Sequence, residues 1–193
     1  TTDGGMAPVV QKELNKMIAS ELERPKVINA GSGGDYATNA LKRLKKDVLT
    51  HNPDIVTISF GLNDTGLRKP EEYKDSLKKM IRSFEDAGIQ VLLMTSTPFN
   101  NEKHGWGEKF EEDGGLDEYM NKEFCDRMRS LADSKKILLC DLHAIFMAEI
   151  KKDPEQINKI ISGDGVHLTA EGYLLISKHV APNIIKLLSK INK

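Results

Sequence analysis

The sequence contains few of the residues that mark several specialised classes of protein. Its 193 residues include two cysteines, Cys125 and Cys140, and neither lies in a metal-ligand spacing. The 28 Lys and Arg nearly balance the 29 Asp and Glu, so the formal net charge of −1 gives no electrostatic reason to expect a nucleic-acid partner. No apolar run approaches the ~18–20 residues of a membrane span. The composition therefore favours none of these specialised classes.

Aromatic residues and an N-terminal leader are scarce or missing as well. Phe, Trp and Tyr make up 6% of the sequence, with a single Trp. Hydrophobic residues still make up 39%, which suits one globular domain over residues 1–193 with a sizeable core. The opening "TTDGG" has no Met and no charged or apolar leader, so we expect it to continue a segment that lies upstream.

Apolar, β-branched runs alternate with patterns of helical period along the chain. The runs predict strands at 26–30, 54–60, 89–97 and 136–142. The helical patterns predict helices at 5–23, 38–49, 70–88, 115–133, 142–152 and 169–191. Strands that are almost continuously apolar and alternate with helices indicate a parallel sheet covered on both faces. We therefore predict an α/β fold, a three-layer α/β/α sandwich.

Ligands of such sheets bind beyond the carboxyl ends of the strands, so the residues that follow each strand are candidates for the site. The first three strands are followed by "GSGGD", "GLND" and "TPFN". The longest irregular stretch, 97–118, follows the third strand and contains the only Trp. We expect it to act as a lid or a substrate-binding insertion, in which Trp106 and His104 contact the substrate.

The stretch "DGVHLTAEGY" at 164–173 places a carboxylate three residues before an imidazole. In a turn with helical spacing, Asp164 would accept a hydrogen bond from one ring nitrogen of His167, and the other nitrogen would face a cleft as a general base. The alternative is a surface turn in which Asp164 only caps the helix that begins near Thr169.

Two further motifs offer hydrogen-bond donors at the same edge of the sheet. The loop "NAGSGGD" is Gly-rich but lacks the spacing of nucleotide-binding loops. Two interpretations remain: the loop points backbone N–H groups at a ligand, or it is a simple tight turn. Asn63 of "GLND" would donate to a developing oxyanion, although an Asx turn is the commoner use of such a residue. Together with the Asp/His pair, these donors are the groups that an acyl-transfer site needs, except for a nucleophile.

These blocks resemble those of the SGNH (GDSL-type) esterases and lipases in order and spacing. The resemblance implies a flavodoxin-like sheet, assigns Gly34 and Asn63 to the oxyanion hole, and makes Asp164 and His167 the catalytic pair. The family's first block, G-D-S, is not in the sequence. "TTDGG" looks like its continuation, so we expect the first strand and the serine immediately before Thr1. Ser32 and Thr1 are weaker candidates for the nucleophile.

The resemblance implies hydrolysis of carboxylic esters through an acyl-enzyme, with a small-molecule ester as substrate and no metal or cofactor. The low aromatic content favours short acyl groups, such as an acetyl ester of a sugar or a simple alcohol. The alternatives are a lysophospholipase or thioesterase of the same family, and a catalytically inactive binding module. Phosphoester hydrolysis is disfavoured because Asp and His residues do not cluster as metal ligands.

Overall fold

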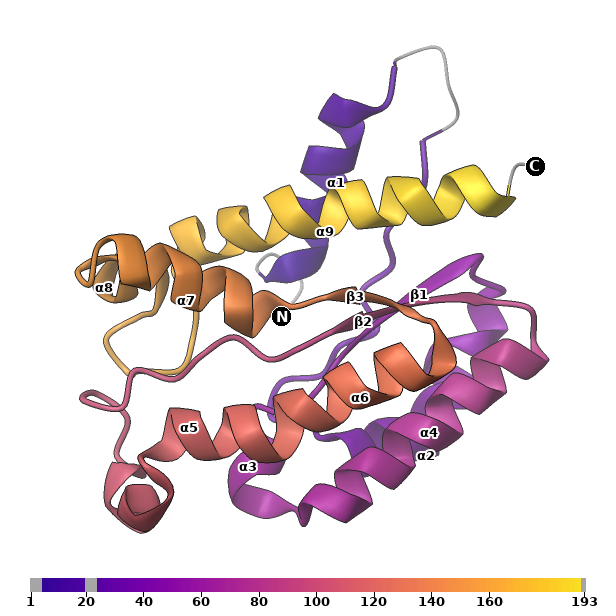
Figure 1. The fold of residues 1–193 in the computed structure, drawn as a ribbon. Helices are drawn as coiled ribbons and strands as arrows, with labels where there is room; N and C mark the ends of the chain where they lie inside the picture. Colours follow the sequence, from indigo (N-terminus) through magenta and orange to yellow (C-terminus); the bar gives the residue numbers. More distant parts are fainter. Residues whose placement is uncertain (1–4, 20–23, 192–193) are drawn as a thin grey trace.

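A parallel sheet of three strands lies between two layers of helices in the computed structural model (Figure 1). The structure describes residues 5–19 and 24–191. The strands are β1 (Ile55–Ser59), β2 (Gln90–Met94) and β3 (Leu138–Cys140), in the order β1-β2-β3. All neighbours are parallel, with Ile55 opposite Gln90 and Leu92 opposite Leu138. The predicted α/β sandwich is confirmed.

The helices agree with most of those predicted from the sequence. One layer contains α2 (Ala37–Asp47), α4 (Pro70–Asp86) and α6 (Asp126–Lys135), and the other contains α1 (Met6–Met17), α7 (Leu142–Lys152) and α9 (Ala170–Ile191). The predicted end of the first helix, 20–23, lies outside the described residues. Shorter elements complete the chain: η1 (Leu49–His51), α3 (Asp64–Leu67), η2 (Gly107–Asp113), α5 (Leu116–Met120), the π-helical η3 (Asn121–Cys125) and α8 (Gln156–Ile160).

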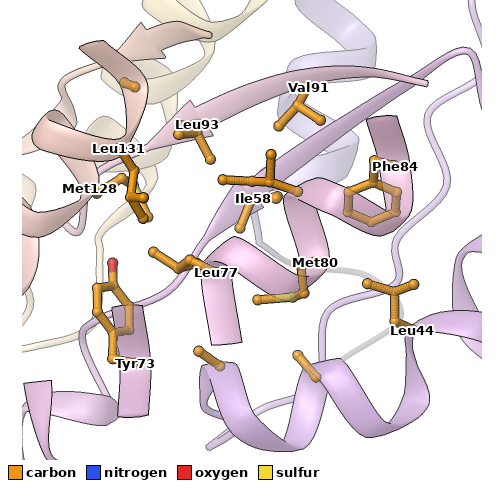
Figure 2. Packing of buried hydrophobic residues seen from close by; sticks show 14 of the residues in the cluster. Leu44, Ile58, Tyr73, Leu77, Met80, Phe84, Val91, Leu93, Met128 and Leu131 are labelled. Carbon is orange, nitrogen blue, oxygen red and sulfur yellow. The ribbon is translucent and has the colours of Figure 1, made fainter. Parts of the chain in front are cut away.

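Both faces of the central strand are buried, which explains why its sequence is apolar throughout. Val91 and Leu93 of β2 pack against the layer of α2, α4 and α6, in a cluster that includes the buried side chains of Tyr73, Leu77 and Phe84 (Figure 2). The alternate residues Leu92 and Met94 face the layer of α1, α7 and α9. Cys140 of β3 is buried against that second layer, and burial raises the pKa of its thiol to about 11.

The strand predicted at 26–30 is wrong, because these residues form no ladder in the described structure. The N–H of Val27 donates to Oε1 of Gln11 at 2.8 Å, and Nε2 of the same side chain donates to the carbonyl of Pro25 at 3.0 Å. A strand exists only where its backbone groups bond to a neighbouring strand. Here a side chain of α1 occupies the groups at the start of the segment instead.

Candidate active site

A tight turn holds Asp164 and His167 in contact. Oδ2 of Asp164 lies 2.7 Å from Nδ1 of His167, while Oδ1 accepts hydrogen bonds from Ser162 Oγ and from the N–H groups of Val166 and His167. The turn is closed by an antiparallel bridge between Ile161 and Leu168. Among the described residues Nε2 of His167 has no hydrogen-bond partner, and 75% of the side chain is exposed. The imidazole is therefore oriented on one side and open on the other.

The hydrogen bonds of this turn hold the Asp164 carboxylate in its ionised form. The Ser162 hydroxyl, then the two backbone N–H groups, then the imidazole lower the pKa of Asp164 well below its usual range. The alternative role of Asp164, as the cap of the last helix, is taken by another residue. Oγ1 of Thr169 accepts from the N–H of Gly172 in the first turn of α9. Asp164 is thus free to orient the imidazole.

Gly165 anchors the turn against the loop that follows β2. Its φ of +77° favours glycine, and a Cβ built there would lie 2.7 Å from the backbone nitrogen of His104 and 2.9 Å from the carbonyl oxygen of Asn100. The N–H of Asn100 donates to the Gly165 carbonyl at 2.8 Å. The loop after β2 therefore supports the Asp164–His167 turn from behind.

The Gly-rich loop and the "GLND" segment are joined by Asn63. Nδ2 of Asn63 donates to the carbonyl of Asp35 at 3.0 Å, across 28 positions of sequence. Gly34 has a φ of +72°, and its N–H donates to no acceptor within the described part of the chain. The amide of Asn63 has two hydrogens, so one remains after the bond to Asp35. Each of the two predicted donors therefore keeps an N–H that is available to a ligand.

Asp64, which the sequence analysis gave no role, holds these two segments in register. It is fully buried, with Oδ1 accepting from the N–H of Ala37 and Oδ2 from the N–H of Gly61, both at 3.0 Å. Burial raises the pKa of its carboxyl to about 6, against the opposing effect of the two N–H groups. In the sequence, the only sign of this role is that the Asp64 carboxylate directly follows the candidate amide of Asn63. The two backbone N–H groups that it binds are brought to it only by the fold.

Trp106 and His104 connect the two halves of the site. The Trp106 ring lies directly over Gly66 of α3, where a Cβ would come within 2.0 Å of it. The His104 ring packs edge-on against Trp106 at 5.3 Å between centroids and against Phe99 at 5.1 Å. His104 also contacts Gly165 through its backbone, so the structure links the "GLND" side to the Asp164 turn.

A hydrophobic cluster also holds the "GLND" segment, Trp106 and the Asp164–His167 turn together. Leu62 of "GLND", Trp106 and Val166 of "DGVH" all pack against the buried side chains of Phe99, Leu116, Met120 and Cys125. The motifs that the sequence separates by about a hundred positions are thus parts of one cluster at the carboxyl edge of the sheet.

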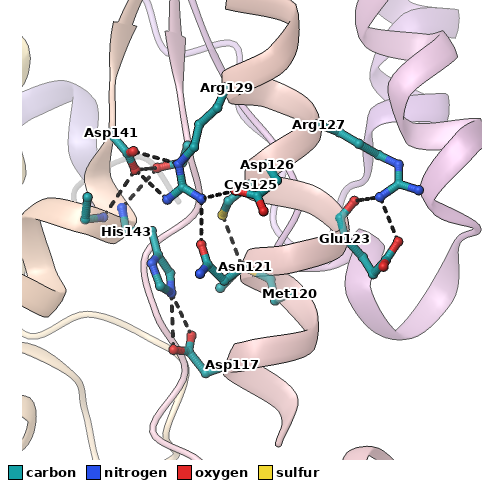
Figure 3. Close-up of polar contacts among 12 residues, drawn as sticks. Asp117, Met120, Asn121, Glu123, Cys125, Asp126, Arg127, Arg129, Asp141 and His143 are labelled. Atoms are coloured by element: carbon teal, nitrogen blue, oxygen red, sulfur yellow. Dashed lines mark hydrogen bonds and ion pairs between the residues drawn. The ribbon is translucent and has the colours of Figure 1, made fainter. Parts of the chain in front are cut away.

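A buried polar network underlies the loop after β2 (Figure 3). Nε2 of His143 lies 3.2 Å from both carboxylate oxygens of Asp117, and Oδ1 of Asp117 also accepts from the N–H of Phe99 at 2.9 Å. Beside it, Arg129 makes a two-pronged contact with Asp141 at 2.7 and 3.0 Å. His143 is thus committed to the support of the loop, and the sequence gave no sign of its pairing with Asp117.

Two negative findings apply to the part of the chain that the structure describes. Residues 5–19 and 24–191 contain no group of three or more His, Cys, Asp or Glu side chains arranged to hold a metal ion. No helix in those ranges combines the length and the apolar character needed to cross a bilayer.

The fold is that of the three-layer α/β proteins, in which loops beyond the carboxyl ends of the strands form the site. The chain belongs to the GDSL-like lipase/acylhydrolase family, whose model matches residues 2–175. This confirms the resemblance to the SGNH esterases, and the protein is accordingly a carboxylic ester hydrolase.

Individual relatives agree with this assignment. An arylesterase of Vibrio mimicus is 29% identical over 162 residues, which cover 83% of this chain and 70% of the relative. The crystal structure of an acetyl xylan esterase, AlAXEase, is 28% identical with a TM-score of 0.73, covering 94% of this chain and 91% of the other. A lipase/acylhydrolase from Enterococcus faecalis shares the fold at 24% identity, with a TM-score of 0.73 over 93% of this chain and 84% of its own.

Proposed function

We propose that the protein hydrolyses short-chain acyl esters, with an acetyl ester of a sugar or simple alcohol as substrate. The observation that carries the proposal is the Asp164–His167 contact of 2.7 Å, whose free imidazole nitrogen is exposed. The acetyl xylan esterase among the relatives supports the choice of acyl group. The nucleophile in this proposal is a serine that precedes Thr1. It belongs to the same single domain as residues 1–193.

In the proposed mechanism Nε2 of His167 takes the proton of the serine hydroxyl as its oxygen attacks the ester carbonyl. Asp164 holds the imidazole through Nδ1 and stabilises its positive charge. The carbonyl oxygen becomes an oxyanion that accepts from the Gly34 N–H, the free hydrogen of the Asn63 amide and the N–H of the serine. The alcohol leaves with the proton from His167, and water then releases the acid by the same sequence of steps.

Trp106 and His104 form the wall of the proposed acyl site. The ring of Trp106 is half-buried over Gly66, on the helix that directly follows Asn63, and His104 fills the space between it and Phe99. In the proposed site this aromatic wall limits the length of the acyl chain. A profile that favours octanoyl over acetyl esters would instead support a lysophospholipase or thioesterase.

The first test is hydrolysis of 4-nitrophenyl acetate by single variants. Asn63→Ala is expected to lower kcat by about 10²–10³, since it removes one oxyanion donor, and His167→Ala is expected to lower it further. His51→Ala, at an exposed histidine in η1, is the matched control and should retain full activity. Undiminished activity in either site variant would refute the assignment. Absence of activity in the unmodified protein would favour the inactive binding module.

The pH profile provides an independent test of the proton acceptor. An imidazole takes a proton only while it is neutral, so activity should fall as the pH decreases. The pKa of Asp164 is held well below its usual range, so this carboxylate stays ionised throughout and does not contribute to the fall. A profile that stays flat to about pH 5 would contradict a histidine base.

A further inference from the structure

Arg68 is a half-buried cation that forms no ion pair with a carboxylate within the described part of the chain. Four other arginines of that part pair with Asp or Glu side chains: Arg43, Arg82, Arg127 and Arg129. Nε of Arg68 is buried and has no hydrogen-bond partner in the same residues. The guanidinium lies over the Tyr36 ring, with Cζ 3.8 Å from the ring centroid. The aromatic ring fixes the cation without neutralising it.

The stacked pair lies next to the proposed oxyanion donors. Arg68 directly follows α3, five positions after Asn63, and its N–H donates to the Asp64 carbonyl at 2.8 Å. Tyr36 follows Asp35, whose carbonyl accepts the Asn63 amide. The Arg68–Tyr36 stack and the Asn63–Asp35 hydrogen bond therefore join the same two segments, side by side.

Nη1 and Nη2 of Arg68 have no partner among the described hydrogen bonds, and Nε alone of the three nitrogens is buried without one. An arginine that contacts a ring through its face still presents its N–H groups in the plane, as a fork that matches a carboxylate or phosphate. Arg68 does not support Asp64 directly, because that buried carboxylate accepts hydrogen bonds from the N–H groups of Ala37 and Gly61 and from no side chain of the described residues. The positive charge of Arg68 favours ionisation of Asp64 from a distance and forms no hydrogen bond to it.

We propose that Arg68 is a specificity-determining residue that binds an anionic group, a carboxylate or an oxyanion of the same geometry, on the alcohol part of the ester. This rests on the proposed function, in which the acyl group is too short to carry the charge itself. The substrate class is then an acyl ester of an acidic alcohol, such as a sugar that bears a carboxylate.

Binding is measured without catalysis through the fluorescence of Trp106, the single tryptophan of the sequence, whose ring covers Gly66 two positions before Arg68. Benzoate and benzamide have nearly the same shape and differ in charge. Benzoate is expected to bind about tenfold more tightly than benzamide, as for a charge-assisted two-pronged contact. Arg68→Gln should bring the ratio of dissociation constants close to one. Arg68→Lys should retain part of the preference, because it keeps the charge but loses the fork and the stacking.

The control is Arg82→Gln, which removes an exposed arginine of α4 and should leave the ratio unchanged. Equal binding of benzoate and benzamide to the unmodified protein would overturn the proposal, as would a preference that survives in Arg68→Gln. If Arg68→Gln does not fold, as judged by circular dichroism, an undiminished preference in Arg68→Lys would overturn it equally.

A kinetic comparison separates this proposal from that of ester hydrolysis. The ratio of kcat/KM for 4-acetoxybenzoate over 4-acetoxybenzamide should exceed one and should fall about tenfold in Arg68→Gln. Loss of both hydrolyses with selective benzoate binding intact would refute the proposed function and support the anion site. Hydrolysis of both esters with equal binding of benzoate and benzamide would refute the anion site alone.

Discussion

Gly66 lies beneath the Trp106 ring with no space for a side chain, since a Cβ there would meet three ring atoms at 2.0 to 2.7 Å. Gly66→Ala must therefore displace Trp106, whereas Trp106→Ala removes the ring. Both variants are expected to increase kcat/KM for 4-nitrophenyl butyrate relative to the acetate about tenfold, the scale of adding or removing space for methylenes in a pocket. Steady-state kinetics with the two esters measures the ratio.

The control for this prediction is Phe110→Ala, in the same insertion but packed against Tyr119 at 4.7 Å between ring centroids. Its ratio of butyrate to acetate hydrolysis should stay at that of the unmodified protein. An equal change in the control, or an unchanged ratio in both Gly66→Ala and Trp106→Ala, would show that the ring does not limit the acyl chain.

Asp64 gives a prediction for stability against pH. Its folded-state pKa of about 6 lies above the ordinary value of 3.8 for this carboxyl group, so the folded state binds the proton more tightly than the unfolded state. The contribution of this group is fully present below the unfolded value and is lost as pH rises through about 6. Asp64→Asn removes the titration and sets its NH₂ group against a backbone N–H, a loss of about 1–3 kcal/mol at neutral pH.

Urea unfolding of the unmodified protein and of Asp64→Asn, at pH 4.5 and at pH 7.5, tests both statements. The difference in free energy of unfolding should be larger at the lower pH, since only the unmodified protein gains from the bound proton. The same difference at both pH values would contradict the titration of Asp64 in this range.

The sequence predicted the candidate residues better than their surroundings. Spacing and chemistry were enough to single out Asp164, His167 and Asn63. They did not indicate that the Asn63 amide donates one of its two hydrogens to the carbonyl of Asp35, because that bond spans 28 positions. They gave Asp64 no role, since its two N–H partners come from the start of α2 and from Gly61, just after β1.

At the scale of elements, the loop that follows β2 depends on the first residues of α5. Asp117, in α5, accepts from the N–H of Phe99 and contacts His143, and all three are buried. Asp117→Ala leaves the Phe99 N–H unsatisfied, so we expect a loss of about 1–3 kcal/mol in the free energy of unfolding. Amide exchange at Phe99 and Asn100 should also accelerate, as measured by NMR or mass spectrometry.

Glu118→Ala is the matched control for this network. Glu118 is the next residue of α5 and contacts only the side chain of Asn101 among its described hydrogen bonds, on the exposed surface. Its loss should be below about 0.5 kcal/mol. Equal losses in the two variants would show that the buried network does not hold the loop in place.

Elements with a strong period were predicted well, and those that depend on distant partners were not. The amphipathic pattern of 70–88 became α4, and the apolar run 89–97 contains β2. The strand at 26–30 failed because periodicity cannot show that Gln11 binds its backbone groups. The predicted helix 115–133 contains the π-helical turn η3 between α5 and α6, an irregularity without a sequence signature.

For the whole molecule, the three layers follow from burial on both faces of a parallel sheet. Alternate side chains of β2 pack against the two helical layers. In the sequence, this burial on both faces is indicated by a continuous apolar run. The convergence of three motifs at one edge was predicted from the topology of parallel strands. The aromatic link from Gly66 through Trp106 and His104 to Gly165 was not, because side-chain packing between loops leaves no period in the sequence.

The proposed mechanism depends on a serine nucleophile activated by His167, and a serine-reactive fluorophosphonate detects such a nucleophile. Intact mass is measured before and after treatment of the natural protein and of its His167→Ala variant. We predict one adduct on the natural protein, mapped to a serine that precedes Thr1, and at least a hundredfold slower labelling of the variant, in keeping with the loss of a general base. No adduct, or labelling that is equally fast without His167, would contradict the account.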